Sequence, residues 1–314
     1  MQIGFIGLGN VGGKLAGSLL RNGQALQVHD LNGALVDAFV ARGAEAGGSP
    51  EAMMKACDAV VTCLPSPAAS AAVMDEMLPE VASGKIWLEM STTDAAEVTR
   101  LGALVEARGG AAVDCPVSGG CHRAATGNIS IFAGAERETF ERVLPLLSLM
   151  GRRILHTGPL GSASVLKVIT NYLATANLVS CAEALTVAKG AGLDLSTAFE
   201  AIRISSGNSF VHETESQVIL NGSRDISFTM DLVAKDIGLF QAVADRAGVP
   251  LELNPALIAI FEDGISRYGA RELSPNIIKR LEDATGLDIR APGFPAEMRD
   301  DEPEALGGEV VPAR

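Results

Sequence analysis

The sequence predicts an α/β fold in which a doubly wound, largely parallel sheet precedes an all-helical domain. Two observations support this. Short β-prone runs alternate with helical patterns up to about residue 161, which is typical of a parallel sheet with helices on both faces. From about residue 164 the strand patterns stop, and helical periodicity continues to about residue 284. A chain of 314 residues is long enough for two such domains.

Composition and charge exclude several classes of protein. Hydrophobic residues make up 47% of the chain and charged residues 20%, as in ordinary globular proteins. A net charge of −13, with no cluster of Lys and Arg, argues against nucleic acid as a main partner. Local cations in a cleft can still bind a small anion. We therefore expect a small-molecule partner.

No targeting or membrane segment is expected. The opening residues, MQIGFIGLGN, lack the features of a signal peptide. No uncharged apolar run of 18 residues predicts a membrane span. The nearest run, 168–182, contains Asn171, Thr175, Asn177 and Ser180, which favour a helix in a soluble core. The five cysteines show neither a C-x-x-C pair nor zinc-site spacing. We expect reduced thiols, no metal, no membrane partner and a cytoplasmic location.

The first strand leads into a glycine-rich turn. Residues 2–6 are β-prone and are followed at once by a G-x-G-x-x-G pattern, Gly7-Leu8-Gly9-Asn10-Val11-Gly12, and then by a helical pattern. The expected roles are a tight turn at Gly7, close approach of a pyrophosphate to the backbone at Gly9, and close helix packing at Gly12. The sequence therefore predicts a Rossmann-type sheet in which these six residues bind a dinucleotide.

The second strand, 26–29, indicates which dinucleotide. It ends at Asp30, 23 residues after Gly7, where a Rossmann unit places the acid that hydrogen-bonds a ribose 2′-hydroxyl. Leu31 and Asn32 follow and provide no arginine for a 2′-phosphate. NAD is therefore favoured over NADP. The alternative interpretation is an aspartate that only belongs to a turn.

Five further strands complete the predicted sheet: 59–64, 85–90, 111–115, 129–133 and 153–156. The last members of this series could run antiparallel. Ligands of such sheets bind at the carboxyl ends of the strands. The loops after two strands are therefore expected to line the cofactor cleft, which adds Leu64, Pro65 and Thr92 to the predicted cofactor-binding residues.

The second half is predicted to be helical over 164–191, 195–204, 210–220, 229–247, 254–268 and 275–284. The predicted domains are a dinucleotide-binding domain, 1–161, an all-helical substrate and oligomerisation domain, 162–288, and an acidic, proline-containing tail, 289–314. The composition of the tail suggests a flexible segment or a strap on a neighbouring subunit.

Four stretches in order resemble the β-hydroxyacid dehydrogenase family, which includes 3-hydroxyisobutyrate dehydrogenase. They are FIGLGNVG at 5–12, DCPVSGG at 114–120, GSASVLKVITN at 161–171, and KD at 235–236. The resemblance covers about residues 1–288. It implies reversible oxidation of the β-hydroxyl of a short 3-hydroxy carboxylic acid to a semialdehyde, with a nicotinamide cofactor.

The resemblance also implies roles for individual residues. Lys167 matches the catalytic lysine of the family and Asn171 its substrate-orienting asparagine. Ser118, Gly119 and Gly120 match the loop that holds the substrate carboxylate. Lys235 matches the lysine that approaches the nicotinamide, with Asp236 beside it.

Other interpretations stay open at this point. Lys167 could only extend its methylenes over apolar surface; as a base it would need a pKa below the usual value of about 10.4. Cys121, His122 and Arg123 replace small apolar residues common in the family, and Arg123 could be a surface residue or an anchor for a sulfonate or second carboxylate.

Rival functions predict different residues. A non-catalytic NAD-binding protein would not need Ser118, Lys167 and Asn171 together. Imine reductases of the same architecture usually lack this lysine, and 6-phosphogluconate-type enzymes are longer and need basic residues for a phosphate. A same-fold reductase of a sulfonate or other substituted substrate remains an alternative.

The long helices of the second half are rich in apolar residues, more than one small domain can cover. They predict a homodimer or homotetramer.

Overall fold

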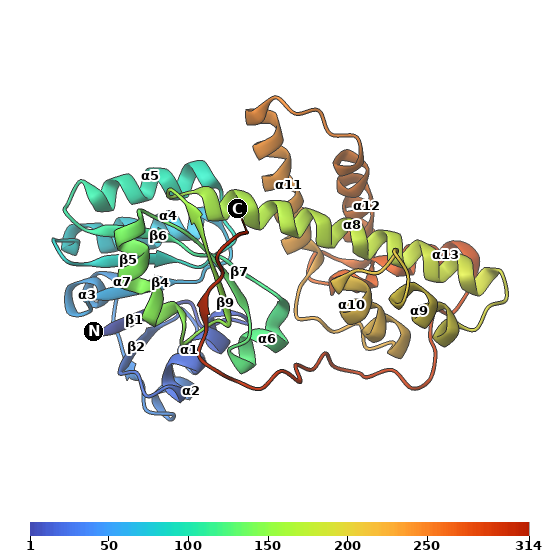
Figure 1. The fold of residues 1–314 in the computed structure, drawn as a ribbon, viewed down its shortest axis with the longest axis horizontal. Coiled ribbons are helices and arrows are strands. Elements are labelled where there is room, and N and C mark those ends of the chain that lie inside the picture. The colour runs from blue at the N-terminus through green and yellow to red at the C-terminus, as the bar shows by residue number, and fades with distance from the viewer. Residues whose placement is uncertain (314) are drawn as a thin grey trace. The chain divides into compact units, whose positions relative to one another are not determined.

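The computed structural model describes residues 1–313 and divides into two compact units. One unit contains Met1–Lys167 and residues 300–313, and the other contains Val168–Arg299. The chain thus passes between the units twice, once inside a long helix and once after Arg299 (Figure 1). The structure confirms the predicted fold class, a Rossmann-type sheet followed by a helical domain.

In the described residues the first unit has a ten-stranded sheet. The strands follow the order β10-β9-β8-β6-β5-β4-β1-β2-β3, and β7 pairs with β8 outside this path. The pairs from β3 to β6 are parallel, β8 is antiparallel to β6, and β9 and β10 continue parallel to β8. Their bounds are β1 Ile3–Ile6, β2 Leu26–His29, β3 Glu45–Ala46, β4 Ala59–Thr62, β5 Ile86–Glu89, β6 Ala111–Asp114, β7 Val117–Ser118, β8 Ser130–Gly134, β9 Arg153–Gly158 and β10 Gly308–Glu309.

Two hydrophobic cores lie on opposite faces of this sheet. Successive strand residues such as Val60 and Val61, or Trp87 and Leu88, belong to different cores, because side chains alternate along a strand. One core includes α1, α2 and α7, and the other α3, α4 and α5, so the sheet is doubly wound. The helices are α1 Gly12–Arg21, α2 Gly33–Val40, α3 Pro50–Ala56, α4 Pro67–Met77, η1 Leu78–Glu80, α5 Ala95–Glu106, α6 Gly120–Thr126 and α7 Arg137–Leu147.

Capping residues fix where the helices start at the carboxyl edge of the sheet. The side chains of Asn32, Ser66 and Asp94 accept backbone hydrogen bonds at the starts of α2, α4 and α5. Pro67 at the first position of α4 supports this start, since its fixed backbone angle suits a helix. The loops between the strand ends and these caps are therefore short and well defined.

The second unit packs helices around its own core. Leu185, Ile219, Ile237 and Phe261 are fully buried at its centre. α8, Ser162–Gly190, starts in the first unit and has 29 residues; it is long and apolar enough to cross a membrane by length and composition, a criterion that core helices also meet. The other helices are α9 Leu195–Arg203, α10 Phe210–Asn221, α11 Met230–Ala247, α12 Leu253–Tyr268, η2 Ser274–Ile278 and α13 Lys279–Thr285.

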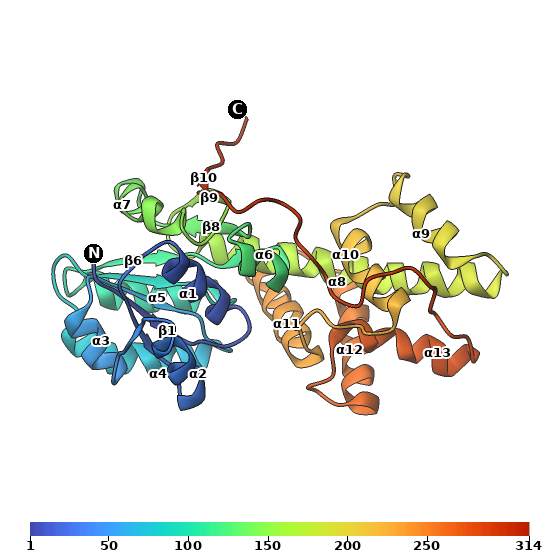
Figure 2. The ribbon, with the colours of Figure 1, turned by 90° about the horizontal axis from the view of Figure 1, so that it is seen from below.

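The C-terminal residues, for which composition suggested a flexible tail or a strap on a neighbouring subunit, pack on their own chain. Residues 300–309 lie against the sheet unit, and we call them the C-terminal strap. Their last two residues form β10 beside β9, which Figure 2 shows in red. Arg137 pairs with Glu309 there, and the strap thereby extends the sheet.

Candidate active site

The glycine turn after β1 is dictated by close backbone contacts. Gly7 has φ +95°, and an added Cβ would lie 2.3 Å from the carbonyl oxygen of Cys63. A Cβ on Gly12 would lie 2.0 Å from the carbonyl oxygen of Gly7. At Gly9, by contrast, an added Cβ would meet no atom within 4 Å. The fold therefore requires glycine at the first and third positions, whereas the second borders open space. Leu8, Asn10 and Val11 complete the turn that leads into α1.

Asp30 lies beside this turn at the end of β2. Its Oδ2 accepts a hydrogen bond from the backbone N–H of Leu8 at 2.7 Å, and its Oδ1 accepts one from Asn32 at 2.8 Å. The carboxylate is thus fixed against the turn, although the two residues are 22 positions apart. Leu31 is 99% exposed and carries no charge that could attract a phosphate.

Hydrogen bonds join the loops after β4 and β5. The backbone N–H of Leu64 donates to Ser91 Oγ at 2.7 Å, and the N–H of Ser91 donates to Glu89 Oε1 at 2.8 Å. Burial raises the pKa of Glu89, whose side chain is inaccessible. These bonds hold the loops that contain Leu64, Pro65 and Thr92 at the carboxyl edge of the sheet.

Asp114 at the end of β6 holds the first turn of α8. Its carboxylate accepts hydrogen bonds from the backbone N–H of Ser164 at 2.7 Å and from Ser164 Oγ at 2.8 Å. Burial raises the pKa of Asp114 to about 7, although the bonds from Ser164 act in the opposite direction. Lys167 is 8% exposed and follows Ser164 by three residues, which is about one helical turn. Asp114 therefore fixes the turn from which Lys167 extends.

The Ser118-Gly119-Gly120 loop needs its two glycines. β7 ends at Ser118, which pairs with Ser130 of β8. Gly119 has φ +127° and Gly120 has φ +87°, values that side-chain-bearing residues rarely adopt. The chain therefore turns with bare backbone immediately after a serine hydroxyl, and α6 starts at once.

Three polar residues meet in the second unit. The Asn171 side-chain amide on α8 donates to Asp236 Oδ2 on α11. Lys235 Nζ lies 3.0 Å from Asp236 Oδ1, and Asp236 is only 1% exposed. The buried carboxylate thus orients the amide and the ammonium together. Asn171 follows Lys167 by four residues in the same continuous helix, so both side chains share a helix face.

The three residues that depart from the family pattern lie on α6. Cys121 Sγ is 3.9 Å from the carbonyl oxygen of Asn10, in the glycine turn. Burial lowers the pKa of His122, and the charge of Arg123 acts in the same direction. Across residues 1–313, no group of three or more His, Cys, Asp and Glu side chains could hold a metal ion.

Comparisons with known proteins match both units. Residues 2–158 match the NAD binding domain of 6-phosphogluconate dehydrogenase, and residues 161–281 match the NAD-binding domain of NADP-dependent 3-hydroxyisobutyrate dehydrogenase. The 2-(hydroxymethyl)glutarate dehydrogenase of Eubacterium barkeri is 34% identical, over 92% of this chain and 97% of its own length. The chain belongs to the β-hydroxyacid dehydrogenase family.

Two further relatives support this assignment. The NAD-dependent L-serine dehydrogenase of Pseudomonas aeruginosa is 34% identical, over 90% of this chain and 98% of its own length. The structure of Mycobacterium tuberculosis 3-hydroxyisobutyrate dehydrogenase with L-serine has a TM-score of 0.81 at 25% identity, covering 89% of this chain and 98% of that one. This chain is thus an NAD-dependent oxidoreductase that interconverts the β-hydroxyl of a 3-hydroxy carboxylic acid and the corresponding semialdehyde.

The residues of the enzyme fit its cofactor. Gly9 is not required by any protein contact, and its open side leaves room for a pyrophosphate close to the backbone. Asp30 is anchored next to the same turn, where an adenosine ribose would need a hydrogen-bond acceptor. The glycine turn and Asp30 would therefore hold NAD.

Two other residues near the candidate site, Asp114 and Asp236, have contacts that the sequence alone does not reveal. Asp114 is the first residue of the DCPVSGG stretch, and the available signal was a carboxylate at the end of an otherwise apolar strand. Asp236 was noticed only as the neighbour of Lys235, yet its contact with Asn171 joins positions 65 residues apart. Neither partner can be identified from spacing alone.

Proposed function

We propose that Lys167 is the general acid/base of this dehydrogenase. The observation that carries the assignment is its placement: a buried lysine that extends from a helical turn held by Asp114. When bound, NAD accepts the hydride that leaves the substrate carbon. The β-hydroxyl must lose its proton in the same step, and a neutral lysine amine can take it. To act as this base, Lys167 needs a pKa below the ordinary lysine value of about 10.4.

The remaining assignments concern substrate and cofactor binding. Ser118, Gly119 and Gly120 offer a hydroxyl and unobstructed backbone N–H groups, which suit a carboxylate. Asn171 would orient the substrate, since Asp236 fixes its amide. Lys235, paired with the same carboxylate, would approach the nicotinamide end of the cofactor.

The substrate class follows from what the relatives are named for. 2-(Hydroxymethyl)glutarate, L-serine and 3-hydroxyisobutyrate all contain a hydroxymethyl group next to the carbon that bears a carboxylate. We infer that this enzyme oxidises a compound of the same form. The identity of the third substituent is tested with a panel of these three acids, glycerate and a sulfonate analogue. A preference for the sulfonate would contradict the assignment of residues 118–120 to a substrate carboxylate.

Replacement of Lys167 tests the central assignment. Lys167→Ala is expected to lower kcat by about 10²-fold or more while NAD affinity and Tm stay near those of the wild type. Lys189→Ala, at the far end of the same helix, is the matched control and should leave kcat unchanged. Near-normal turnover of Lys167→Ala would show that Lys167 only packs against its surroundings.

We further propose that the enzyme is a cytoplasmic homodimer or homotetramer. On α8, Leu173 is 53% exposed and Val187 is 70% exposed, and only 33% of the most apolar 18-residue segment of this helix is buried. Exposed apolar surface of this kind favours association with a second copy. All five cysteines are free thiols, which suits a reducing compartment. Light scattering at micromolar concentration measures the mass in solution, and the mass of a monomer would contradict this proposal.

A further inference from the structure

The segment that follows Ser118 leaves the sheet and then returns to it. It leaves β7, turns at Gly119 and Gly120, runs through α6, and returns as β8. Pairing of Ser118 with Ser130 closes its base. Its outer end is the turn 126–128, where α6 stops. Contacts that hold this outer end therefore also limit how far the Ser118-Gly119-Gly120 loop can move.

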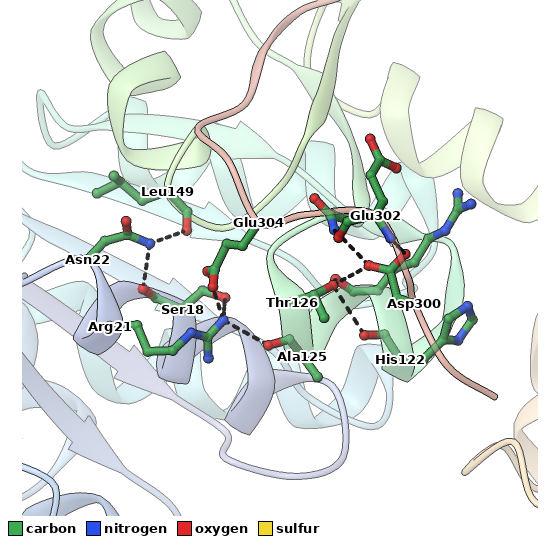
Figure 3. Close-up of polar contacts among 12 residues, drawn as sticks. Ser18, Arg21, Asn22, His122, Ala125, Thr126, Leu149, Asp300, Glu302 and Glu304 are labelled. Atoms are coloured by element: carbon green, nitrogen blue, oxygen red, sulfur yellow. Dashed lines mark hydrogen bonds and ion pairs between the residues drawn. The ribbon is translucent and has the colours of Figure 1, made fainter. Parts of the chain in front are cut away.

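The C-terminal strap holds that outer end. Asp300 Oδ2 accepts hydrogen bonds from Thr126 Oγ1 and, at 2.7 Å, from Asn128 Nδ2. Asn128 Nδ2 also donates to the carbonyl oxygen of Glu302 at 2.6 Å, and Asn128 is fully buried. Figure 3 shows the strap lying across these residues. One carboxylate thus joins the last residue of α6 to the loop that enters β8.

The Asp300 carboxylate is well suited to this contact. Burial alone would raise its pKa, but the hydrogen bonds from Thr126 and Asn128 and the charge of Arg123 hold the pKa below its ordinary value. Asp300 therefore stays ionised near neutral pH. Hydrogen bonds to an ionised acceptor are stronger than those between neutral groups.

The rest of the strap is anchored to rigid parts of the same unit. Glu302 pairs with Arg153 at 3.2 Å, and Glu304 pairs with Arg21 of α1 at 3.1 Å. β10 then adds to the edge of the sheet beside β9. Asp300 is thus held by a segment that is itself fixed at several points. The strap lies beyond residue 281, where the family match ends, so it is not explained by the shared fold.

We propose that the C-terminal strap positions the loop that binds the substrate carboxylate, with Asp300 as the positioning residue. This inference rests on the proposed role of Ser118, Gly119 and Gly120. Asp300 would act through Thr126 and Asn128, and would touch neither substrate nor cofactor. The strap then contributes to KM for the acid, whereas Lys167 governs the chemical step.

Steady-state kinetics of Asp300→Ala in the full chain test the proposal. KM for the hydroxyacid should rise about tenfold, while kcat and KM for NAD stay within about twofold. The tenfold change corresponds to about 1.4 kcal/mol. The matched control is Glu309→Gln, which breaks the ion pair with Arg137 at the other end of the strap and leaves the α6 contacts intact. This control should leave all three constants unchanged.

A double-mutant cycle and hydrogen exchange make the test specific to this contact. Thr126→Val should raise KM alone, and should add little in the Asp300→Ala background, because both changes remove the same bond. Amide exchange should accelerate in residues 118–128 of Asp300→Ala, but not in the glycine turn at 7–12.

Two outcomes would overturn the proposal. Unchanged KM and unchanged exchange at 118–128 in Asp300→Ala would show that the strap does not position the loop. An equal rise in KM in Glu309→Gln would show a general loss of stability instead. Ser118→Ala separates this from the proposed function: if that variant keeps its KM for the acid, the carboxylate assignment fails, whereas the exchange result still reports on the strap.

Discussion

The glycine turn at residues 7–12 and the C-terminal strap at 300–309 both belong to the sheet unit, yet they are held by different forces. Backbone atoms leave no room for a Cβ at Gly7 or Gly12, so these two glycines have no substitute in the turn. Charged and polar side chains hold the strap through partners about 150 to 280 residues away. The constraint on the turn is steric, and the contacts of the strap are electrostatic.

This difference determines how each region tolerates change. A steric requirement fails at the first extra atom, because a packed backbone cannot move aside cheaply. An electrostatic contact on a partly exposed surface weakens gradually, since water and neighbouring charges replace a lost partner. We therefore expect single substitutions to reduce stability strongly at Gly7 and Gly12 and only slightly in most of the strap.

The largest effect is expected at Gly12. Gly12→Ala would place a Cβ 2.0 Å from the Gly7 carbonyl oxygen, which forces α1 away from β1. We expect about 3 kcal/mol of lost stability, at the upper end for overpacking, together with loss of NAD binding. Urea unfolding and NAD titration measure the two effects.

Gly9→Ala is the matched control for that prediction. Its Cβ would meet no protein atom within 4 Å, so the free energy of unfolding should change by less than about 0.5 kcal/mol. NAD affinity should nevertheless fall, because the methyl group occupies the space left for the pyrophosphate. Equal loss of stability in both variants would contradict the distinction between a steric and a ligand requirement.

Asp114 combines features of the turn and of the strap. It belongs to a short sequence motif, but its hydrogen-bond partner is 50 residues away. Its pKa in the folded protein is about 7, above the ordinary 3.8, so the folded state binds more protons between these values. Stability should therefore fall as pH rises from about 4 to about 7, by an amount on the order of a few kcal/mol. Below about pH 4 this destabilisation is absent, and above about pH 7 it is complete.

Asp114→Asn should reduce this dependence. The neutral amide cannot ionise, so the free energy of unfolding should decline less between pH 5 and pH 7 than in the wild type. Burial also raises the pKa of Glu89, which contributes with the same sign, so the measured quantity is the difference between the two proteins. Asp75→Asn, which replaces an exposed acid on α4, serves as control. Parallel pH curves for wild type and Asp114→Asn would refute the assignment.

Much of the fold was predictable because it leaves a periodic trace in the sequence. Short continuous apolar runs located β4, β5 and β6, whose residues are almost all buried, and the helical pattern of α8 was visible over nearly its whole length. The two-residue strands β3, β7 and β10 were not predicted, because two residues show no period. Periodicity reports burial, and these strands depend on pairing more than on burial.

The candidate site was predictable to a different extent. Motifs located the glycine turn, Ser118 and Lys167, since each motif lies within a few consecutive residues. Asp114 and Asp236 gained their partners only from the folded chain, as did Asp300. A hydrogen bond between distant residues depends on the whole tertiary structure, and no spacing rule encodes it.

The preference between cofactors is expected to be about a hundredfold in favour of NAD. Asp30 is fixed beside the glycine turn by Leu8 and would repel a 2′-phosphate. A repulsion of about 2.7 kcal/mol corresponds to that ratio. Asp30→Ala should reduce the ratio of kcat/KM for NAD over NADP at least tenfold, whereas Asp37→Ala on α2 should leave it unchanged. A wild-type enzyme that favours NADP would contradict the role of Asp30.

The smallest effect is expected at the end of the strap. Glu309 pairs with Arg137 through two N–O contacts, at 2.5 and 2.9 Å, and their side chains are 20% and 49% exposed. Exposed ion pairs typically contribute under about 1 kcal/mol, so Glu309→Gln should lower the free energy of unfolding by no more than that. The difference from wild type should shrink further in about 1 M salt, which screens exposed charges. A loss above about 2 kcal/mol, unaffected by salt, would show that this pair anchors the strap as strongly as a steric contact, and the contrast with the glycine turn would no longer hold.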